Sequence, residues 1–357
     1  MARFYEQNID VIIKPDALID NIKEIRYQYD IDGGVFVLST PAAREHGIEQ
    51  ILIDAGYSPV VMWGEKYGDL TEPTHAQIAE AYKDFAISDC DSILAMGGGS
   101  IVDLGKGVVY NSLADVRPTF IAVPTTYSGA EITKGLMIVK GPGDKKPVYD
   151  ENCRPDILIL DSTLADTLPT TTSLIIAVDA LTHCLEGAAS TIQHPIAEGA
   201  ALHGINLALQ HLPTTEITPE FREAFATIGF LGSKAMDCAL GHIHNVSFSV
   251  GPRAGLKHGE INTLFAPAII EASLRRNNNA YQFIDIDKLL SVFEFYIREW
   301  KLYERYLPKH QELFVETAIA NANYTTHPVD LDAEDFRWIF EITLERARAS
   351  VETALNE

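Results

Sequence analysis

Short apolar runs alternate with helical stretches through the first half of the chain, and this alternation limits the possible folds more than any other feature. The apolar runs are short enough to be buried parallel strands. They lie at residues 35–39, 60–64, 93–96 and 120–124, with helical stretches at 44–55 and 75–85. Strands that alternate with helices in this way predict a parallel sheet covered by helices.

A second region begins near Pro169, where long helical patterns replace the alternation. Just before it, a turn-rich segment predicts a hairpin over residues 136–149, and a last strand is expected at 157–160. The long helices are expected at residues 172–190, 195–210, 219–240, 259–276, 285–302 and 333–354. Because 357 residues exceed what one core fills, we predict two domains. These are an α/β N-terminal Rossmann-like domain at residues 1–164 and an all-α C-terminal domain at residues 165–357.

The composition argues against several classes of partner. A formal net charge of -22 disfavours binding to nucleic acid and to anionic membranes. The N-terminal segment lacks the pattern of a secretory signal, and no apolar stretch is long enough to span a membrane. The four cysteines lie far apart, which argues against a disulfide scaffold and against a cysteine zinc site. We expect a cytoplasmic protein.

Three consecutive glycines, Gly97, Gly98 and Gly99, join an expected strand to a helix that starts near Ser100. Glycines let the backbone approach a ligand closely, and the free N–H groups of a helix start suit a pyrophosphate. The spacing differs from the usual G-x-G-x-x-G fingerprint, so a tight turn without a ligand is the alternative. We interpret the segment as a phosphate-binding turn.

Hydroxyl groups gather after the following strand, at Thr125, Thr126 and Ser128. Open α/β sheets bind their ligands at this end of the strands. Hydroxyls that only cap the next helix would give the same pattern, so this feature alone predicts little.

Metal-binding residue types fall in two clusters of the helical region. Asp179 and His183 are four residues apart, which places them on one face of a helix. His244 and His258 are separated by fourteen residues that include Gly251 and Gly255, so a break in the helix can bring them together. One carboxylate and three imidazoles form a mixed site fit for Fe²⁺ or Zn²⁺. An Asp–His hydrogen bond and buried core histidines are the alternative explanation.

Together these motifs resemble the iron-containing alcohol dehydrogenase family, within the dehydroquinate synthase-like fold, over nearly the whole chain. The family pattern G-G-G-S-x-x-D-x-x-K is met at residues 97–106, including Asp103 and Lys106. The pattern D-A-x-x-H is met at 179–183, the spaced histidines end in H-G at 258–259, and T-x-P occurs at 326–328.

The resemblance implies a metal-dependent oxidoreductase that passes a hydride between NAD(H) or NADP(H) and a small alcohol, aldehyde or keto acid. It also implies a homodimer or a larger homo-oligomer. By this resemblance the cofactor would be bound by Ser39, Gly97, Gly98, Gly99, Ser100, Asp103, Thr125, Thr126, Ser128 and Lys145, and the metal by Asp179, His183, His244 and His258. An acidic residue after the first strand would select NAD over NADP, but Ser39 and Thr40 stand there with Arg44 nearby, so both cofactors stay open.

Two features depart from the family pattern. Members usually carry a further histidine four residues after the third ligand, near the nicotinamide, where this chain has Phe248. That histidine is thought to relay the proton. His242 is a possible substitute, although it would face away from His244 on a regular helix, so the residues expected to act in catalysis are His258, Phe248 and His242. The segments V-L-S-T-P at 37–41 and P-T-T-Y-S-G-A-E at 124–131 resemble the maleylacetate reductase branch, which often lacks the aspartate ligand present here.

Two other functions stay open. A non-redox lyase or cyclase could use the same fold, metal and NAD without net oxidation, although few basic residues lie near the motifs for a phosphorylated sugar substrate. A non-catalytic relative could keep the cofactor for regulation, although the complete set of metal ligands argues against it.

Overall fold

The computed structural model describes residues 9–68, 70, 73–113, 116–127, 129, 131–141, 144–192, 194–236, 240–306, 311–322 and 325–356. By its internal contacts the chain divides into two compact units. Unit 1 comprises residues 1–173 and 217–233, and unit 2 comprises residues 174–216 and 234–357. The predicted division has a single boundary, after residue 164. The contacts instead put the first boundary after residue 173, and they assign residues 217–233 to unit 1 as well.

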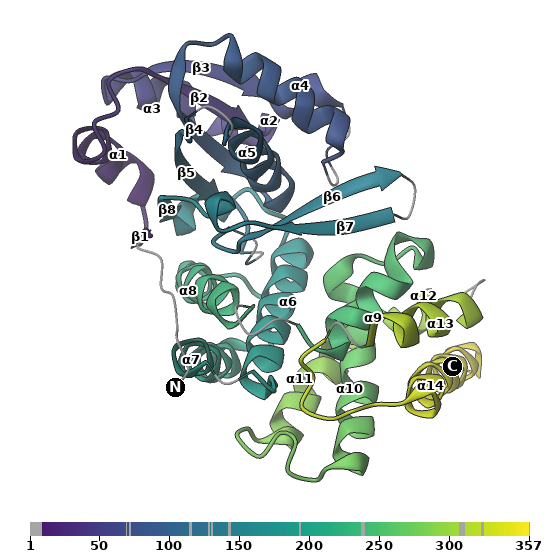
Figure 1. Ribbon diagram of the computed structural model, residues 1–357. Coiled ribbons are helices and arrows are strands. Elements are labelled where there is room, and N and C mark those ends of the chain that lie inside the picture. The colour runs from purple at the N-terminus through teal and green to yellow at the C-terminus, as the bar shows by residue number, and fades with distance from the viewer. Residues whose placement is uncertain are drawn as a thin grey trace. The chain divides into compact units, whose positions relative to one another are not determined.

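Unit 1 contains a six-stranded parallel sheet and a separate two-stranded hairpin, β6 and β7 (Figure 1). The order of the sheet is β1-β8-β5-β4-β2-β3, and every pairing in it is parallel. The strands are β1 Asp10–Ile13, β2 Gly34–Ser39, β3 Ser58–Trp63, β4 Cys90–Gly97, β5 Thr119–Pro124, β6 Gly135–Gly141, β7 Asp144–Tyr149 and β8 Ile157–Leu160. The helices are α1 Ala17–Gln28, α2 Pro41–Glu45, α3 Ile48–Asp54, α4 His75–Ala86, α5 Gly99–Ser112 and most of α8 Pro219–Ala235.

Helices cover both faces of the sheet because the strands are apolar on both faces. On one face, Val35 and Val37 of β2 pack with Leu94, Ile121 and the buried side chains of α1, α2 and α3. On the other face, α5 approaches β4 and β5 closely. A Cβ at Gly105 would lie only 2.9 Å from that of Ala95, so this glycine permits the close contact.

Unit 2 is helical. Its helices are α6 Thr170–Ala189, which begins in unit 1, α7 Pro195–His211, α9 His242–Val250, α10 His258–Arg276, α11 Ile286–Glu299, α12 Leu302–Arg305, α13 Gln311–Asn321 and α14 Ala333–Asn356. Helix α10 is buried along most of its length, and it contacts α9, α11 and α14. Among the described residues, no helix combines the length and the apolar character that crossing a membrane requires.

The predicted fold class is confirmed, and most predicted elements occur within a few residues of their expected bounds. The helix expected at 44–55 is wrong in one respect, because the chain forms two helices there. Gly47 adopts a φ of 66° between α2 and α3 and interrupts the helix. Strand β1 and helices α1 and α13 were not predicted.

Candidate functional site

The glycine-rich turn has the predicted strand–turn–helix geometry. Strand β4 ends at Gly97, Gly98 is the N-cap of α5, and the helix starts at Gly99. A Cβ at Gly97 would lie 2.9 Å from the side chain of Ile101, so a larger residue would push the helix away from the strand. The N-cap residue Gly98 has no side chain to cap this helix start. Its first N–H groups therefore suit a phosphate.

The loop after β5 lies beside this turn. The backbone N–H of Thr125 donates to the carbonyl of Gly97 at 2.9 Å, and a Cβ at Gly98 would contact the side chain of Thr126. The hydroxyl-bearing loop and the glycine turn thus lie together at the carboxyl ends of β4 and β5, as expected for neighbouring parallel strands. Ser128 and the side chain of Lys145 lie outside the described residues.

Three residues of the predicted cofactor motifs already have structural contacts. The Ser39 hydroxyl is buried and donates to the carbonyl of Met96 at 3.0 Å. The fully buried Lys106 donates to the Thr133 hydroxyl and to the carbonyl of Gly135, and its ammonium lies 3.8 Å from Asp103. Burial lowers the pKa of Lys106, although Asp103 opposes that shift.

The carboxylate of Asp179 and two predicted histidine ligands converge within unit 2. Asp179 lies on α6, His244 in the first turn of α9, and His258 at the start of α10. Oδ1 of Asp179 lies 3.8 Å from Nε2 of His244 and 3.7 Å from Nε2 of His258. One ligand atom from each residue lies within 4.8 Å of the other two, which is close enough for all three to bind one ion.

The fourth predicted ligand, His183, lies beside this group without completing it. Its ring stacks on the ring of His244 with centroids 4.5 Å apart. Burial lowers the pKa of His183 to about 4, although Asp179 opposes the shift. Burial by itself would raise the pKa of Asp179, but His258, His183 and His244 outweigh it, and the pKa is held below its ordinary value. The carboxylate is therefore ionised and the His183 ring neutral at neutral pH, as metal ligands must be.

Two buried polar atoms test whether these residues fit a cation. Among the described residues, Nδ1 of His183 and Oδ1 of Asn262 are buried and have no hydrogen-bond partner. The Asn262 amide nitrogen lies 2.6 Å from Oδ1 of Asp179, and 3.2 Å and 3.4 Å from Nε2 of His244 and of His258. All three ligand atoms thus face the Asn262 amide nitrogen, and the Asp179 carboxylate accepts from it. The donor set fits a divalent ion that accepts mixed N/O ligands.

The remaining predicted residues divide between two places. Phe248 stacks on the ring of His258 with centroids 5.5 Å apart and is 44% exposed. His242 instead contacts His327 and Phe336, with ring centroids 4.2 Å and 5.0 Å away. The hydroxyl of Ser247 lies 2.7 Å from Nδ1 of His258.

Three residues at this site were not singled out from the sequence. Glu186 contacts Nδ1 of His244, Ser247 contacts Nδ1 of His258, and Asn262 contacts all three ligand atoms. Two of them had a signal in their spacing. Glu186 is seven residues after Asp179 and Asn262 four after His258, so each shares a helix face with a predicted ligand.

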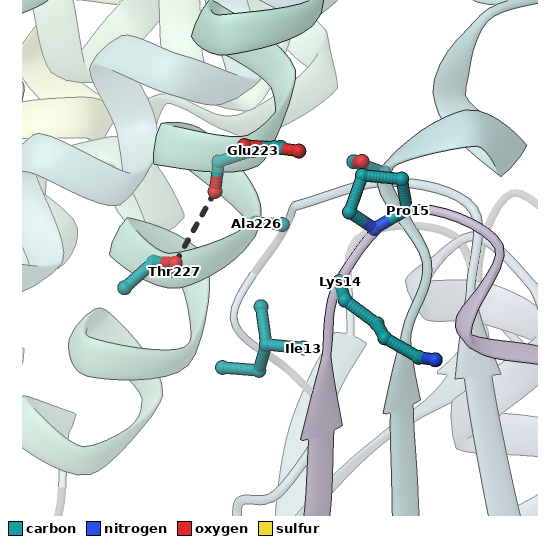
Figure 2. A pocket seen from close by; sticks show the side chains of 7 residues that line it. Ile13, Lys14, Pro15, Glu223, Ala226 and Thr227 are labelled. Carbon is teal, nitrogen blue, oxygen red and sulfur yellow. Dashed lines mark hydrogen bonds between the residues drawn. The ribbon is translucent and has the colours of Figure 1, made fainter. Parts of the chain in front are cut away.

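A cavity of about 200 Å³ lies elsewhere, in unit 1, next to the end of β1 and helix α8 (Figure 2). Its lining residues are Ile13, Lys14, Pro15, Ser162, Glu223, Ala226 and Thr227. The hydroxyl of Thr227 donates to the carbonyl of Glu223 within the helix. None of these seven described residues belongs to a predicted site.

Two family descriptions match successive parts of the chain. The model of the iron-containing alcohol dehydrogenases matches residues 20–162, and the model of the C-terminal part of the Fe-containing alcohol dehydrogenase family matches residues 174–295. The structure of an iron-containing alcohol dehydrogenase from Thermococcus thioreducens superposes with a TM-score of 0.84, covering 96% of this chain and 100% of that one. At 18% sequence identity this likeness establishes the fold.

Characterised relatives are dehydrogenases and reductases. A 4-hydroxybutyrate dehydrogenase of Cupriavidus necator is 27% identical over 227 residues, which cover 56% of this chain and 59% of that protein. An NADPH-dependent butanol dehydrogenase of Clostridium saccharobutylicum is 26% identical over 341 residues, 84% of each chain. Maleylacetate reductase 1 of Cupriavidus pinatubonensis is 31% identical over 202 residues, 55% of each chain.

Proposed function

The chain belongs to the iron-containing alcohol dehydrogenase family, and we propose that it transfers a hydride between NAD(H) or NADP(H) and a small alcohol, aldehyde or keto acid. The observation that carries this proposal is the convergence of Asp179, His244 and His258 on one position in unit 2. The names of the relatives, which include an alcohol dehydrogenase and two enzymes of carboxylated substrates, support hydride transfer over the non-redox alternative.

Asp179, His244 and His258 would hold the divalent ion, with His183 as a further ligand after a small movement of its ring. A divalent ion there would polarise the substrate oxygen, and the nicotinamide would supply or accept the hydride. Fe²⁺ is the ion typical of the family, and Zn²⁺ suits the same donors. The choice of Fe²⁺ or Zn²⁺ as the native ion stays open.

Phe248 would shape the substrate side of the centre. It stacks on His258 and is partly exposed, so it gives the site an apolar edge beside one ligand. Phenylalanine carries no ionisable proton, and His242 is engaged with His327 and Phe336. Proton exchange with the substrate would therefore use water or a hydroxyl of the cofactor.

In unit 1, Gly97, Gly98, Gly99 and Ser100 would bind the pyrophosphate at the start of α5, with Thr125 and Thr126 beside them. Lys106 and Ser39 would act indirectly, because their polar groups are used to hold neighbouring backbone. Cytoplasmic location, a homo-oligomeric state and the choice between NAD and NADP stay predictions.

The test is an absorbance screen of NADH and NADPH with alcohols, aldehydes and keto acids, with Fe²⁺ and Zn²⁺ supplied separately. We expect turnover that depends on the metal. His258→Ala should lose both bound metal and turnover, whereas His203→Ala, at an exposed position of α7, should keep both. Full retention of metal and turnover in the His258 variant would overturn the proposed centre, and product formation without net change in NAD(P)H would favour the lyase.

A further inference from the structure

We propose that Glu186 is the positioning residue of the candidate metal centre, holding the His244 ring so that its Nε2 faces Asp179 and His258. This inference rests on the metal centre proposed above. Glu186 lies on α6, seven residues after Asp179, and its side chain is almost completely buried.

Three donors converge on the Glu186 carboxylate. One oxygen, Oε2, accepts from the backbone N–H of Gly241 at 2.9 Å and lies 2.6 Å from Nδ1 of His244. The other, Oε1, accepts from the backbone N–H of Ile243 at 2.5 Å. A carboxylate can only accept, so Nδ1 of His244 carries the proton and Nε2 keeps its lone pair for a metal.

The same carboxylate also holds the backbone at the start of helix α9. Gly241 is the N-cap of α9 and has no side chain to cap it, so Glu186 satisfies N–H groups that would otherwise be unpaired. Since His244 lies in the first turn of α9, the backbone and the ring of this ligand are both tied to α6. Asp179 is on that helix too, so one element fixes the relative positions of two ligands.

Gly241 gives independent evidence that the carboxylate must come this close. Its backbone is extended, with φ -95° and ψ -156°, so any residue could adopt its conformation. A Cβ there would nevertheless lie 2.7 Å from Oε1 of Glu186 and 3.0 Å from Nδ1 of His327. Glycine is thus required here by the approach of the Glu186 carboxylate and of the His327 ring, and not by the backbone angles.

The two histidine ligands differ in their supporting partners. Nδ1 of His258 contacts the neutral hydroxyl of Ser247, whereas Nδ1 of His244 contacts a buried carboxylate. A carboxylate partner fixes the tautomer and makes the imidazole a stronger electron donor to a metal. Of the two histidine ligands, His244 is therefore the one whose bond to a metal depends more on its supporting partner, the Glu186 carboxylate.

The test uses Glu186→Gln in the full chain, with Co²⁺ as the probe. An amide has one acceptor oxygen, so its NH₂ group must face at least one of the three donors. We expect the Kd for Co²⁺, measured by competition with a chelator, to rise about ten- to a hundredfold, with a changed Co²⁺ absorption spectrum.

The matched control is Asn245→Ala, which removes a different anchor of the same helix, the hydrogen bond from Nδ2 of Asn245 to the carbonyl of Ala318. This variant should lower the Tm of the metal-free protein but keep the wild-type Kd and spectrum. Wild-type Kd and spectrum in Glu186→Gln would overturn the proposal. Equal weakening in both variants would also overturn it, because Glu186 would then act only by stabilising α9.

Gly241→Ala is a second variant that keeps the carboxylate but displaces it, and it should weaken Co²⁺ binding in the same direction. If Glu186→Gln does not fold, the Kd of Gly241→Ala decides the question, and a wild-type value rejects the proposal. Failure of the proposed function has a different signature. In that case the wild-type chain itself binds no Co²⁺, Fe²⁺ or Zn²⁺.

Discussion

Asn262 offers the sharpest test of the candidate centre, because its amide nitrogen donates to Asp179 and lies near Nε2 of both histidine ligands. In Asn262→Asp an acceptor would replace a donor that lies 2.6 Å from Oδ1 of Asp179. The native state would relieve the resulting repulsion by taking up one proton, either between the two carboxyl groups or on a nearby imidazole such as His258.

The cost of that proton limits the loss of stability. Protonating a carboxyl group of ordinary pKa, about 3.9, costs about 4 kcal/mol near pH 7, at about 1.4 kcal/mol per pH unit. We therefore expect the metal-free variant to lose up to about 4 kcal/mol of unfolding free energy near pH 7. The native variant binds one proton more than its unfolded chain, so its stability falls as pH rises, and the loss should be smaller near pH 5 by up to about 3 kcal/mol.

A divalent cation would remove this penalty. The cation would displace the extra proton of the Asn262→Asp variant and would then interact with a second carboxylate. The Kd of this variant for Co²⁺ should therefore fall by about tenfold or more relative to the wild type, and fall further as pH rises. Urea unfolding of the metal-free protein and chelator competition measure the two effects. Asn278→Asp, which adds the same charge at an exposed position, is the control. If both variants show equal stability and equal Kd values, the amide of Asn262 does not face a cation site.

Three further predictions concern the metal, a buried histidine and the sheet. Chelation should abolish hydride transfer while NADH binding, followed by fluorescence, persists, because the predicted nucleotide residues include no metal ligand; loss of NADH binding would contradict this. Burial, and then His242, hold the pKa of His327 well below its ordinary value. Its contribution to stability is full above about pH 6.5 and is lost as pH falls, at about 1.4 kcal/mol per pH unit. His327→Asn should therefore reduce the decrease in unfolding free energy between pH 6 and pH 5 by about that amount, and an unchanged decrease would refute the assignment. Gly105→Ala should cost about 1–3 kcal/mol in urea unfolding, because its Cβ would meet Ala95 at 2.9 Å and Phe120 at 3.0 Å, and it should leave Co²⁺ affinity unchanged.

The sequence predicted the architecture because its signals were local. Apolar runs of strand length and the interruption at Gly97 needed no knowledge of distant residues. Convergence of His244 and His258 was also predictable, because the helix ends at Val250 and positive φ angles at Gly251 and Gly255 allow the chain to turn back. The break at Gly47 was missed because one glycine within a helical pattern is usually tolerated.

Other features of the site depend on tertiary packing, which the spacing does not reveal. The four-residue interval correctly puts Asp179 and His183 on the same helix, yet it does not show that the His183 ring stacks on His244. The partner of each imidazole is likewise set by how α6, α9 and α10 pack. Glu186 shares a helix face with Asp179, but its contact with His244, like that of Ser247 with His258, could not be identified without the structure.

The supporting contacts suggest how the centre achieves its orientation before an ion arrives. Glu186 accepts a hydrogen bond from Nδ1 of His244, and Ser247 contacts Nδ1 of His258. Nε2 of both rings faces the same oxygen of Asp179. The carboxylate partner sets the tautomer of His244, whereas the Ser247 hydroxyl can donate to or accept from Nδ1 of His258. Binding an ion would require the Asn262 amide and the His183 ring to move. These two groups also contain the atoms Oδ1 and Nδ1 that are buried without a hydrogen-bond partner among the described residues. The centre therefore has two imidazole nitrogens that already face Asp179 and two polar groups whose buried atoms could gain a partner when an ion binds.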